Sequence, residues 1–417
     1  MKEKTAYLIS IGDELLIGQV KDTNSSWIAE KLTGLGIIVK KIMAVQDEEN
    51  EIIKALNEAI SNADYVFTTG GLGPTLDDIT KKTFAKFLNV EMEFNEEFYN
   101  KVKAYVKMRG GEIKDMLYDY SFFPKNTVFL KNRVGSAPGM LFKKNGATII
   151  SMPGVPPEMK SIFTDEVIPL LQKENKDFYI VKKTILTSGE LEAVIADKLK
   201  GITDSMPDNL SFAYLPNLGR VRLRLSAKGK DKEALEALIQ KYSGKIHDKI
   251  GDLIFGYDND TIEQVVGKML LERNLQLATA ESCTGGNIAH FITSVPGSSS
   301  YFKGSVVAYA NETKENVLNV NPKTLENFGA VSEQTAKEMV AGALKAINTD
   351  IAVASTGIAG PTGGTPEKPV GTIWLAAGTK DDVKTLKLQL GKNRLKNIET
   401  STVLALNLLR KFLLSKK

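Results

Sequence analysis

The segment ATAESCTGG concentrates side chains that could perform nucleophilic catalysis. It holds Ser282, Thr284 and the single cysteine of the chain, Cys283, and it ends in a glycine pair. A serine hydroxyl is a weak nucleophile until a base removes its proton, and a lysine made neutral in a dry pocket can serve as that base. The later segment YFKGSVVAYANETK offers Lys314 as the base and Tyr309 as a group that relays the proton or fixes the lysine. These residue types predict a Ser-Lys mechanism.

Cys283 is an alternative nucleophile. A cysteine that attacks a substrate is commonly paired with a basic residue such as histidine. The chain holds two histidines, His247 and His290, and we expect both to be structural. Small free cysteines pack readily in protein cores, so we expect Cys283 to pack rather than to react.

Ser282 and Thr284 also have a structural interpretation, because either hydroxyl could cap the helix that we expect to begin near Gly285. Gly285 and Gly286 fit both interpretations. Glycines at a turn can open backbone N–H groups toward an oxyanion or a phosphate. The sequence leaves the two interpretations open.

Three further polar clusters follow predicted strands in the first third of the chain. IGDELLIGQVKDTN offers Asp13 and Asn24, and SMPGVPPEM offers Glu158. Between them, TTGGLGPTLDDIT joins a glycine turn to Asp77 and Asp78. Such a turn can cradle a phosphate, and carboxylates beside it can hold Mg²⁺ or a similar divalent metal. Taken singly, each cluster could also be a turn or a helix cap.

From this combination we predict a metal-dependent site. Asp77 and Asp78 are its predicted catalytic residues. The predicted metal ligands are Asp13, Asp78 and Glu158. The predicted substrate-binding residues are Gly70, Gly71, Gly73, Thr80 and Asn24.

The elements that must position these residues alternate along the chain. In the first third, apolar runs such as TAYLISIG and ADYVFTTGG alternate with helical segments, which is typical of an α/β domain with a largely parallel sheet. The helix that starts at the prolines of VPPEMKSIF is expected to end near Leu171. The last third again alternates strands and helices, from a helix at Thr261 to a C-terminal helix. Polar clusters at strand ends fall where open parallel sheets bind ligands.

The middle of the chain predicts a small α+β, KH-like module. Its strand GRVRLRLSAKG places Arg220, Arg222 and Arg224 on one face. A basic RNA-contacting face is conceivable, but a half-buried strand with a solvated outer face is the favoured interpretation. No Gly-x-x-Gly loop supports a KH-type grip on nucleic acid. The predicted domains are 1–172, 173–257 and 258–417.

Composition limits the class of protein. A chain of 417 residues exceeds what one core usually organises, and 42% hydrophobic with 25% charged residues is ordinary for a globular protein. A net charge of +4 is too small to imply a nucleic-acid or membrane surface by itself. The start MKEKTAYLISIG lacks the pattern of a signal peptide. We expect a cytoplasmic protein that forms a homodimer and has neither a nucleic-acid nor a membrane partner.

The N-terminal motifs GDELLIG, DTN, GGLGPTLDDIT and PGVPPEM together resemble the first domain of the CinA family. That domain is similar to the molybdopterin-binding fold of the MogA and MoeA proteins. The resemblance implies metal-dependent cleavage of the pyrophosphate of ADP-ribose to AMP and ribose 5-phosphate. Pterin binding is the alternative, because the glycine turn alone fits both.

The C-terminal motifs ATAESCTGG, AYANETK, GIAGPTGG and EKPVGT resemble the PncC-type deamidases of nicotinamide mononucleotide, which form the C-terminal half of CinA proteins. The resemblance implies hydrolysis of that carboxamide to nicotinate mononucleotide and ammonia, with no cofactor. Arg394 is expected to hold the nucleotide phosphate. The residues expected to bind this substrate are Thr284, Gly285, Gly286, Thr356, Gly357, Gly360, Gly363 and Arg394.

Two positions depart from the family pattern, and two rival classes stay open. Ile398 stands where many relatives carry a second arginine, so phosphate affinity is expected to be weaker or differently supplied. Leu191 replaces a serine in the middle module, which puts a specific role of that turn in doubt. The rivals are a competence-related nucleic-acid accessory protein and a pterin-handling scaffold with a dormant C-terminal domain.

Overall fold

The chain folds as two compact units, Met1–Val181 with Lys228–Leu235 and Lys182–Ala227 with Glu236–Lys417. The computed structural model describes residues 3–73, 75, 78–108, 115–174 and 178–416. The second unit contains the predicted C-terminal domain and most of the predicted middle module, whose residues 173–181 and 228–235 belong to the first unit. The division into three domains at 172 and 257 therefore stays a prediction.

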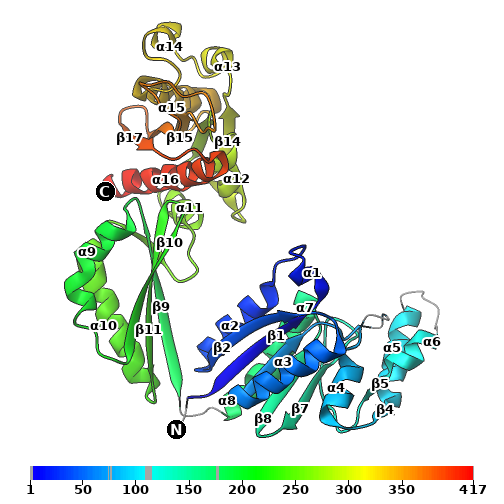
Figure 1. Ribbon diagram of the computed structural model, residues 1–417. Helices are drawn as coiled ribbons and strands as arrows, with labels where there is room; N and C mark the ends of the chain where they lie inside the picture. Colours follow the sequence, from blue (N-terminus) through cyan, green and yellow to red (C-terminus); the bar gives the residue numbers. More distant parts are fainter. Residues whose placement is uncertain (1–2, 74, 76–77, 109–114, 175–177, 417) are drawn as a thin grey trace. The chain divides into compact units, whose positions relative to one another are not determined.

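The first unit is built on a six-stranded sheet with the order β2-β1-β3-β8-β7-β6 (Figure 1). The first four strands in this order are parallel, and β7 and β6 continue the sheet antiparallel. The prediction of a largely parallel sheet is confirmed. Its strands are β1 (Thr5–Ile11), β2 (Ile38–Val45), β3 (Tyr65–Thr69), β6 (Val128–Leu130), β7 (Gly139–Lys144) and β8 (Ala147–Met152), with β4 (Met92–Phe94) and β5 (Phe122–Pro124) forming a separate pair.

Helices cover both faces of this sheet. One hydrophobic cluster joins α3 and α4 to one face, and a second joins α2, α7 and α8 to the other. All seven residues of β1 are buried, as a strand covered on both faces requires. The helices are α1 (Asp13–Leu16), α2 (Thr23–Gly34), α3 (Glu49–Asn62), α4 (Thr80–Leu88), α5 (Glu96–Met108), α6 (Asp115–Tyr120), α7 (Pro156–Ile162), η1 (Phe163–Val167) and α8 (Ile168–Glu174).

The helix that starts at the prolines runs further than expected. Pro156 occupies its first position, where a missing N–H costs nothing. The segment passes through a π-helical turn and ends at Glu174, three residues beyond the predicted Leu171. The polar run that marks the predicted boundary lies partly outside the described residues.

A four-stranded sheet of order β10-β11-β9-β12 lies mostly in the second unit, and two helices lie alongside it (Figure 1). The predicted alternation in β11 is confirmed, because Val221, Leu223 and Leu225 are buried while the arginines between them are exposed or half-buried. The elements are β9 (Tyr179–Ser188), α9 (Glu192–Thr203), β10 (Leu210–Asn217), β11 (Arg220–Gly229), α10 (Lys232–Ile250) and β12 (Ile254–Tyr257).

The rest of the second unit is an α/β domain around a five-stranded sheet of order β14-β13-β15-β16-β17. The first three strands in this order are parallel, and β16 and β17 are antiparallel. Its strands are β13 (Leu277–Glu281), β14 (Phe302–Val307), β15 (Ile351–Gly357), β16 (Thr372–Gly378) and β17 (Val383–Gln389). Its helices are α11 (Ile262–Glu272), α12 (Asn287–Thr293), η2 (Ser298–Ser300), α13 (Asn311–Asn316), α14 (Pro322–Phe328), α15 (Glu333–Ile347) and α16 (Arg394–Ser415).

Helix α16 joins the two parts of the second unit. Its buried Arg410 donates hydrogen bonds to the main-chain carbonyls of Ile254 at 3.0 Å and Asp252 at 3.2 Å. Asn407, one turn earlier, donates to the Ser188 carbonyl at 3.4 Å. The two parts are thus linked by buried polar contacts from one helix.

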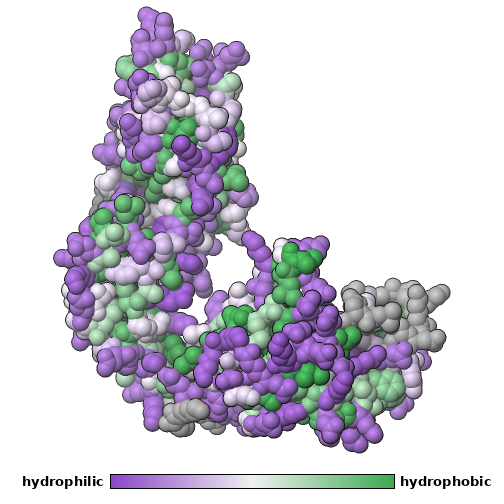
Figure 2. Space-filling view, in the orientation of Figure 1, coloured by the Kyte–Doolittle hydropathy of each residue, from purple (hydrophilic) through white to green (hydrophobic). Residues whose placement is uncertain are grey.

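Exposed apolar side chains gather at one place in the first unit. Leu16, Ile17 and Val20 are 50%, 74% and 51% exposed. They lie at α1 and just after it, where Figure 2 shows a hydrophobic cluster.

Among the described helices, none has the length and apolar composition needed to cross a membrane.

Leu191 occupies the N-cap position of α9, where it caps nothing. Its backbone has the extended conformation that a cap needs, but the side chain accepts no hydrogen bond from the helix. Leu191→Ser is expected to stabilise the chain by about 1 kcal/mol, because a serine hydroxyl can accept an N–H of the first turn. A higher urea midpoint and slower amide exchange in that turn would confirm this. Faster exchange would contradict it.

Candidate functional site

A buried lysine contacts a serine at the carboxyl edge of the five-stranded sheet. Ser282 directly follows β13, and Lys314 lies in α13, which comes after β14. Because these strands are parallel neighbours, both residues leave the same edge of the sheet. The Lys314 Nζ lies 3.2 Å from the Ser282 Oγ. Lys314 is only 1% exposed, so the predicted pair meets in a dry environment.

Two main-chain carbonyls hold the lysine. The Lys314 Nζ donates to the Ala308 carbonyl at 2.8 Å and to the Tyr309 carbonyl at 3.2 Å. Burial lowers the pKa of Lys314 from its ordinary value of 10.5, and the neighbouring Cys283 opposes this shift. A neutral amine has two hydrogens, which the two carbonyls can accept, so its lone pair is left for the serine hydroxyl. This arrangement suits a lysine that takes a proton from Ser282.

Glu281 orders the turn that carries the serine. Its fully buried carboxylate accepts N–H bonds from Gly286, Ile288 and Ala289 at 3.0, 3.0 and 2.8 Å. It also accepts the Thr284 hydroxyl at 2.7 Å. These donors are the orphan N–H groups at the start of α12. A buried acid therefore caps α12 and closes the turn around Ser282.

The contacts of this carboxylate correct two predictions and exclude one interpretation that the sequence left open. Thr284 does not line the cavity beside Ser282, because its hydroxyl lies between Glu281 and Ser355. The N–H groups of Gly285 and Gly286 are not open to an oxyanion, because they donate to the Ser282 carbonyl and to Glu281. The capping interpretation of Ser282 and Thr284 is also wrong, since no hydroxyl caps α12.

The cavity beside Ser282 has a volume of about 210 Å³. Tyr309 and Arg394 stand at its wall, and the arginine donates to the tyrosine hydroxyl at 2.8 Å and to the Gly360 carbonyl at 2.9 Å. Tyr309 is 62% exposed. Its hydroxyl thus contacts Arg394 rather than the Ser-Lys pair, which does not favour the predicted proton relay. The described lining residues are Ser282, Cys283, Tyr309, Asn311, Lys314, Ala330, Val331, Thr356, Gly357, Ala359 and Arg394.

The remaining predicted binding residues divide between the cavity and its surroundings. Thr356 and Gly357 line it at the end of β15, although the Thr356 hydroxyl already donates to the Ala330 carbonyl at 2.7 Å. Gly360 and Gly363 do not line it, although the Gly360 carbonyl accepts a hydrogen bond from Arg394.

Cys283 lines the same cavity but is poorly suited to attack. It is 5% exposed and belongs to the hydrophobic core of the domain. Burial raises the pKa of its thiol to about 12, so the nucleophilic thiolate is scarce at neutral pH. His247 and His290 are exposed and lie outside the cavity, so neither is placed to act as a base there.

The glycine turn of the first unit sits where the ends of β1, β3 and β8 meet. Gly70 approaches the Ile11 carbonyl so closely that a Cβ would lie 2.1 Å from that oxygen. A Cβ on Gly71 would lie 2.0 Å from the Thr80 hydroxyl, and one on Gly73 would lie 2.4 Å from the Asp78 carboxylate. Gly70 therefore requires bare backbone, and the positive φ of 63° also favours glycine at position 71.

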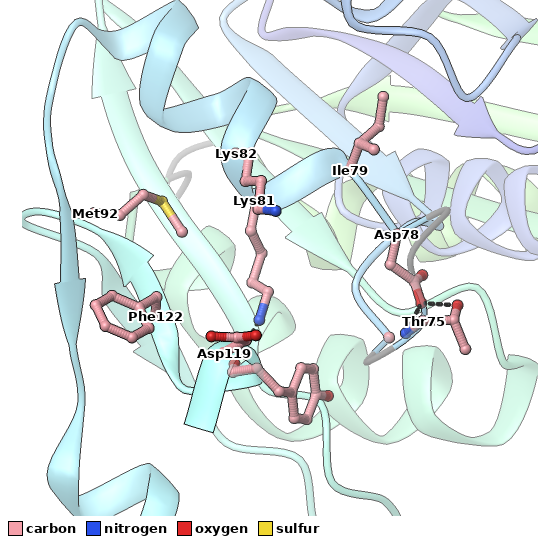
Figure 3. Close-up of a pocket in the computed structure, with 10 residues that line it drawn as sticks. Thr75, Asp78, Ile79, Lys81, Lys82, Met92, Asp119 and Phe122 are labelled. Atoms are coloured by element: carbon pink, nitrogen blue, oxygen red, sulfur yellow. Dashed lines mark hydrogen bonds between the residues drawn. The ribbon is translucent and has the colours of Figure 1, made fainter. Parts of the chain in front are cut away.

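Asp78 holds the turn, and two buried polar atoms beside it have no partner. Asp78 accepts the main-chain N–H of Thr75 at 2.9 Å and its hydroxyl at 2.5 Å (Figure 3). The Thr80 hydroxyl and the Asn24 Oδ1 are buried and unpaired among the described residues, while the Asn24 amide donates to the Gly154 carbonyl at 2.7 Å. Such orphan atoms are expected where a ligand supplies the missing hydrogen bonds.

A cavity of about 380 Å³ lies next to this turn. Its wall combines Asp78 with two lysines, Lys81 and Lys82, and with Asp119. Figure 3 shows the Lys81 side chain extending across the cavity toward the segment that carries Asp119. Burial lowers the pKa of Lys81 to about 8 although Asp78 opposes the shift. The lining offers both charges to a ligand.

The predicted metal ligands do not form one cluster. Asp13 is exposed and its carboxylate faces the Asp47 N–H at 3.3 Å. Glu158 accepts from Asn132 at 2.5 Å. No group of three or more acidic, cysteine or histidine side chains among the described residues could hold a metal ion, and Asp77 lies outside them. The described carboxylates therefore do not by themselves supply a metal centre.

Several residues at the two sites are not evident from the sequence. Glu281 and Asn311 lie within the motifs around Ser282 and Lys314, but their burial and contacts depend on the folded turn. Asn132 and Gly135 lie against the Glu158 carboxylate. Asn132 donates a hydrogen bond to it, and a Cβ on Gly135 would lie 2.1 Å from the carboxyl carbon of Glu158. The segment KNRVGSAPG, a polar turn after a short strand, is the signal that could have indicated them.

The fold and the sites define a class of protein: a molybdopterin-binding-like α/β domain, a KH-like module and an α/β domain with a buried Ser-Lys pair. Three family matches agree with this class. They are "Probable molybdopterin binding domain" over residues 7–173, "Damage-inducible protein CinA KH domain" over 182–256 and "CinA C-terminal domain" over 259–413.

Full-length relatives define the family. The chain is 43% identical over 406 residues to a CinA-like protein of Cytophaga hutchinsonii, covering 97% of both chains. It is 41% identical to a putative competence-damage inducible protein of Halothermothrix orenii, covering 98% of both. A solved competence/damage inducible protein from Agrobacterium tumefaciens is 39% identical over 36% of this chain and 92% of its own, with a TM-score of 0.35. The chain belongs to the CinA family.

Proposed function

We propose that the C-terminal site hydrolyses the carboxamide of nicotinamide mononucleotide to nicotinate mononucleotide and ammonia. One observation carries this proposal: a buried lysine, whose pKa is lowered by burial, contacts the hydroxyl of Ser282 at 3.2 Å in a cavity that Arg394 borders. A Ser-Lys pair performs acyl transfer. The arginine fork can bind a phosphate through two parallel N–H bonds.

The chemistry proceeds through an acyl-enzyme. Lys314 takes the proton of Ser282 as the Oγ attacks the amide carbon, and the same proton then goes to the leaving nitrogen as the C–N bond breaks and ammonia departs. Water then attacks the ester, giving its proton to Lys314, and the serine leaves with that proton restored.

The N–H groups of Cys283 and Thr284 are the ones in the turn left for an oxyanion, since those of Ser282, Gly285 and Gly286 have other acceptors.

Phosphate recognition at this site depends on Arg394. Ile398 stands where many relatives carry a second arginine. Its side chain packs against the hydrophobic core of the domain, which explains an apolar residue at this position. Arg394 therefore has no arginine one turn later to share the phosphate. We expect the loss of the Arg394 side chain to raise the KM for the nucleotide more than it lowers kcat.

Product analysis tests the proposal directly. The full chain is incubated with nicotinamide mononucleotide, and ammonia and nicotinate mononucleotide are measured in parallel. Equal amounts of both products support the assignment. Absence of both from folded protein would overturn it.

The pH dependence follows from the lowered pKa of Lys314. Its protonated form cannot accept the serine proton, so kcat/KM is expected to rise with pH through the folded-state pKa of Lys314, which lies below 10.5. The rate then reaches a plateau above that value. A Cys283→Ser variant should keep the same profile. A rate that falls over this range would contradict a lysine base.

We also propose that the N-terminal site cleaves ADP-ribose to AMP and ribose 5-phosphate. The supporting observation is the glycine turn beside a 380 Å³ cavity that carries Asp78, Lys81 and Lys82. Lysines there can pair with phosphate, and the orphan Thr80 and Asn24 atoms can bind the nucleotide. A divalent cation stays part of this proposal, because Mg²⁺ often binds through one or two carboxylates together with water and substrate phosphates.

Asp78→Asn tests the second site. The substitution is expected to remove most ADP-ribose cleavage, by about a hundredfold or more, while ammonia release from nicotinamide mononucleotide stays near normal. The two activities lie in different compact units, each with its own core. AMP is measured with and without chelator. Equal loss of both activities in a folded variant would contradict independent sites.

A further inference from the structure

A second cavity of the second unit, of about 470 Å³, is separate from the Ser282 site. Three leucines of β17 and its exit, Leu386, Leu388 and Leu390, form one wall. Thr400 and Leu404 of α16 form another. Residues 189–191 before α9, Glu192 at its start and the β10–β11 turn close it. Its volume is within the range of small-molecule sites, which are mostly apolar with a few placed polar groups.

Leu191 lines this cavity with an apolar side chain, but as the N-cap residue it leaves α9 without a side-chain cap. It is 72% exposed and stands at the N-cap of α9, where it leaves the first-turn N–H groups without a side-chain acceptor. Leu386 on the opposite wall is 36% exposed. An exposed leucine in a position that favours serine or aspartate is unfavourable. A ligand that covers it would offset this cost.

The cavity also carries opposite charges that do not pair with each other. Arg220 lines it from the β10–β11 turn, and Glu192 lines it from the start of α9. Among the described residues neither forms an ion pair. Glu190, also in the wall, already accepts the Leu191 N–H at 3.0 Å. A guanidinium and a carboxylate on an apolar wall match a ligand with one charge of each sign.

We propose that this cavity binds a small zwitterion with an apolar body, the chemistry of aliphatic and aromatic amino acids. Arg220 pairs with the ligand carboxylate and Glu192 with its ammonium group. The leucines of β17 and α16, together with Leu191, contact the apolar side chain. The site is independent of the amide chemistry at Ser282, and its test uses binding alone.

The test is calorimetric titration of the full chain with L-leucine and L-phenylalanine. Saturable binding of at least one is expected. N-acetyl-L-leucine lacks the ammonium charge and L-leucinamide lacks the carboxylate, and each should bind at least about tenfold more weakly than L-leucine. Equal affinity for the charged and blocked forms would overturn the proposal, as would the absence of binding by both amino acids.

Variants locate the site. Leu386→Trp fills the cavity from an already exposed position and should abolish binding. Arg220→Gln should weaken binding at least about tenfold without a folding risk, because the side chain is only half-buried. Arg222→Gln is the matched control, since it lies two residues along the same strand but outside the cavity. Binding that survives both Leu386→Trp and Arg220→Gln would show that the amino acid binds elsewhere.

Discussion

Ser282→Ala is expected to lower ammonia release from nicotinamide mononucleotide by at least about a thousandfold, because it removes the attacking oxygen. Lys314→Met should cost nearly as much, since methionine fills the buried volume without accepting a proton. The double variant should lose little more than either single one, because the pair acts as a unit. The measurement is initial ammonia release by each variant, with folding checked by circular dichroism.

Cys283→Ala is the matched control for this prediction. The thiol is buried beside the serine, and its pKa is raised to about 12, so its removal should lower stability modestly and leave turnover recognisable. A thiol-selective reagent is a weaker test, because added bulk beside Ser282 would block the cavity. Should Cys283→Ala be folded but inactive while Ser282→Ala retains near-normal rate, the nucleophile is the cysteine.

Glu281→Ala is expected to destabilise the C-terminal domain by about 3 kcal/mol or more. The substitution leaves three N–H groups and the Thr284 hydroxyl without their buried acceptor. The Ser282 turn should lose its order as well, so activity falls even where the protein is still folded. The measurement is the urea midpoint of the full chain, together with ammonia release.

Two further variants sharpen the role of Glu281. Glu281→Gln keeps the volume but turns an amide N–H₂ toward N–H donors, so it should not restore the wild-type midpoint. Glu312→Gln, an exposed acid in the same domain, should change the midpoint by less than about 0.5 kcal/mol. An unchanged midpoint for Glu281→Ala would show that the turn does not depend on this carboxylate.

The sequence determined the elements and the place of the chemistry. Apolar periodicity indicated the strands on both sides of Ser282 and Lys314, and parallel strands end at a common edge. That rule is enough to bring Ser282, Lys314 and Thr356 together, although they are separated in the chain by tens of residues. The glycine turn from Gly70 to Gly73 was likewise evident, and at Gly70 a side chain would collide with the backbone of Ile11.

Only the tertiary structure decided which polar groups pair with one another. In the sequence, Glu281 is an ordinary acidic residue at the end of a strand. In the folded chain its buried carboxylate accepts the N–H groups at the start of α12, so the Gly286 N–H is not open to an oxyanion. The Tyr309 hydroxyl accepts a hydrogen bond from Arg394, 85 residues later, whereas its main-chain carbonyl is the group that helps to hold Lys314. A hydrogen bond depends on positions within a few tenths of an ångström and on exclusion from water, and local periodicity carries neither. The pattern of residues therefore predicts where a site lies, whereas the packed fold determines which side chains are free to act in it.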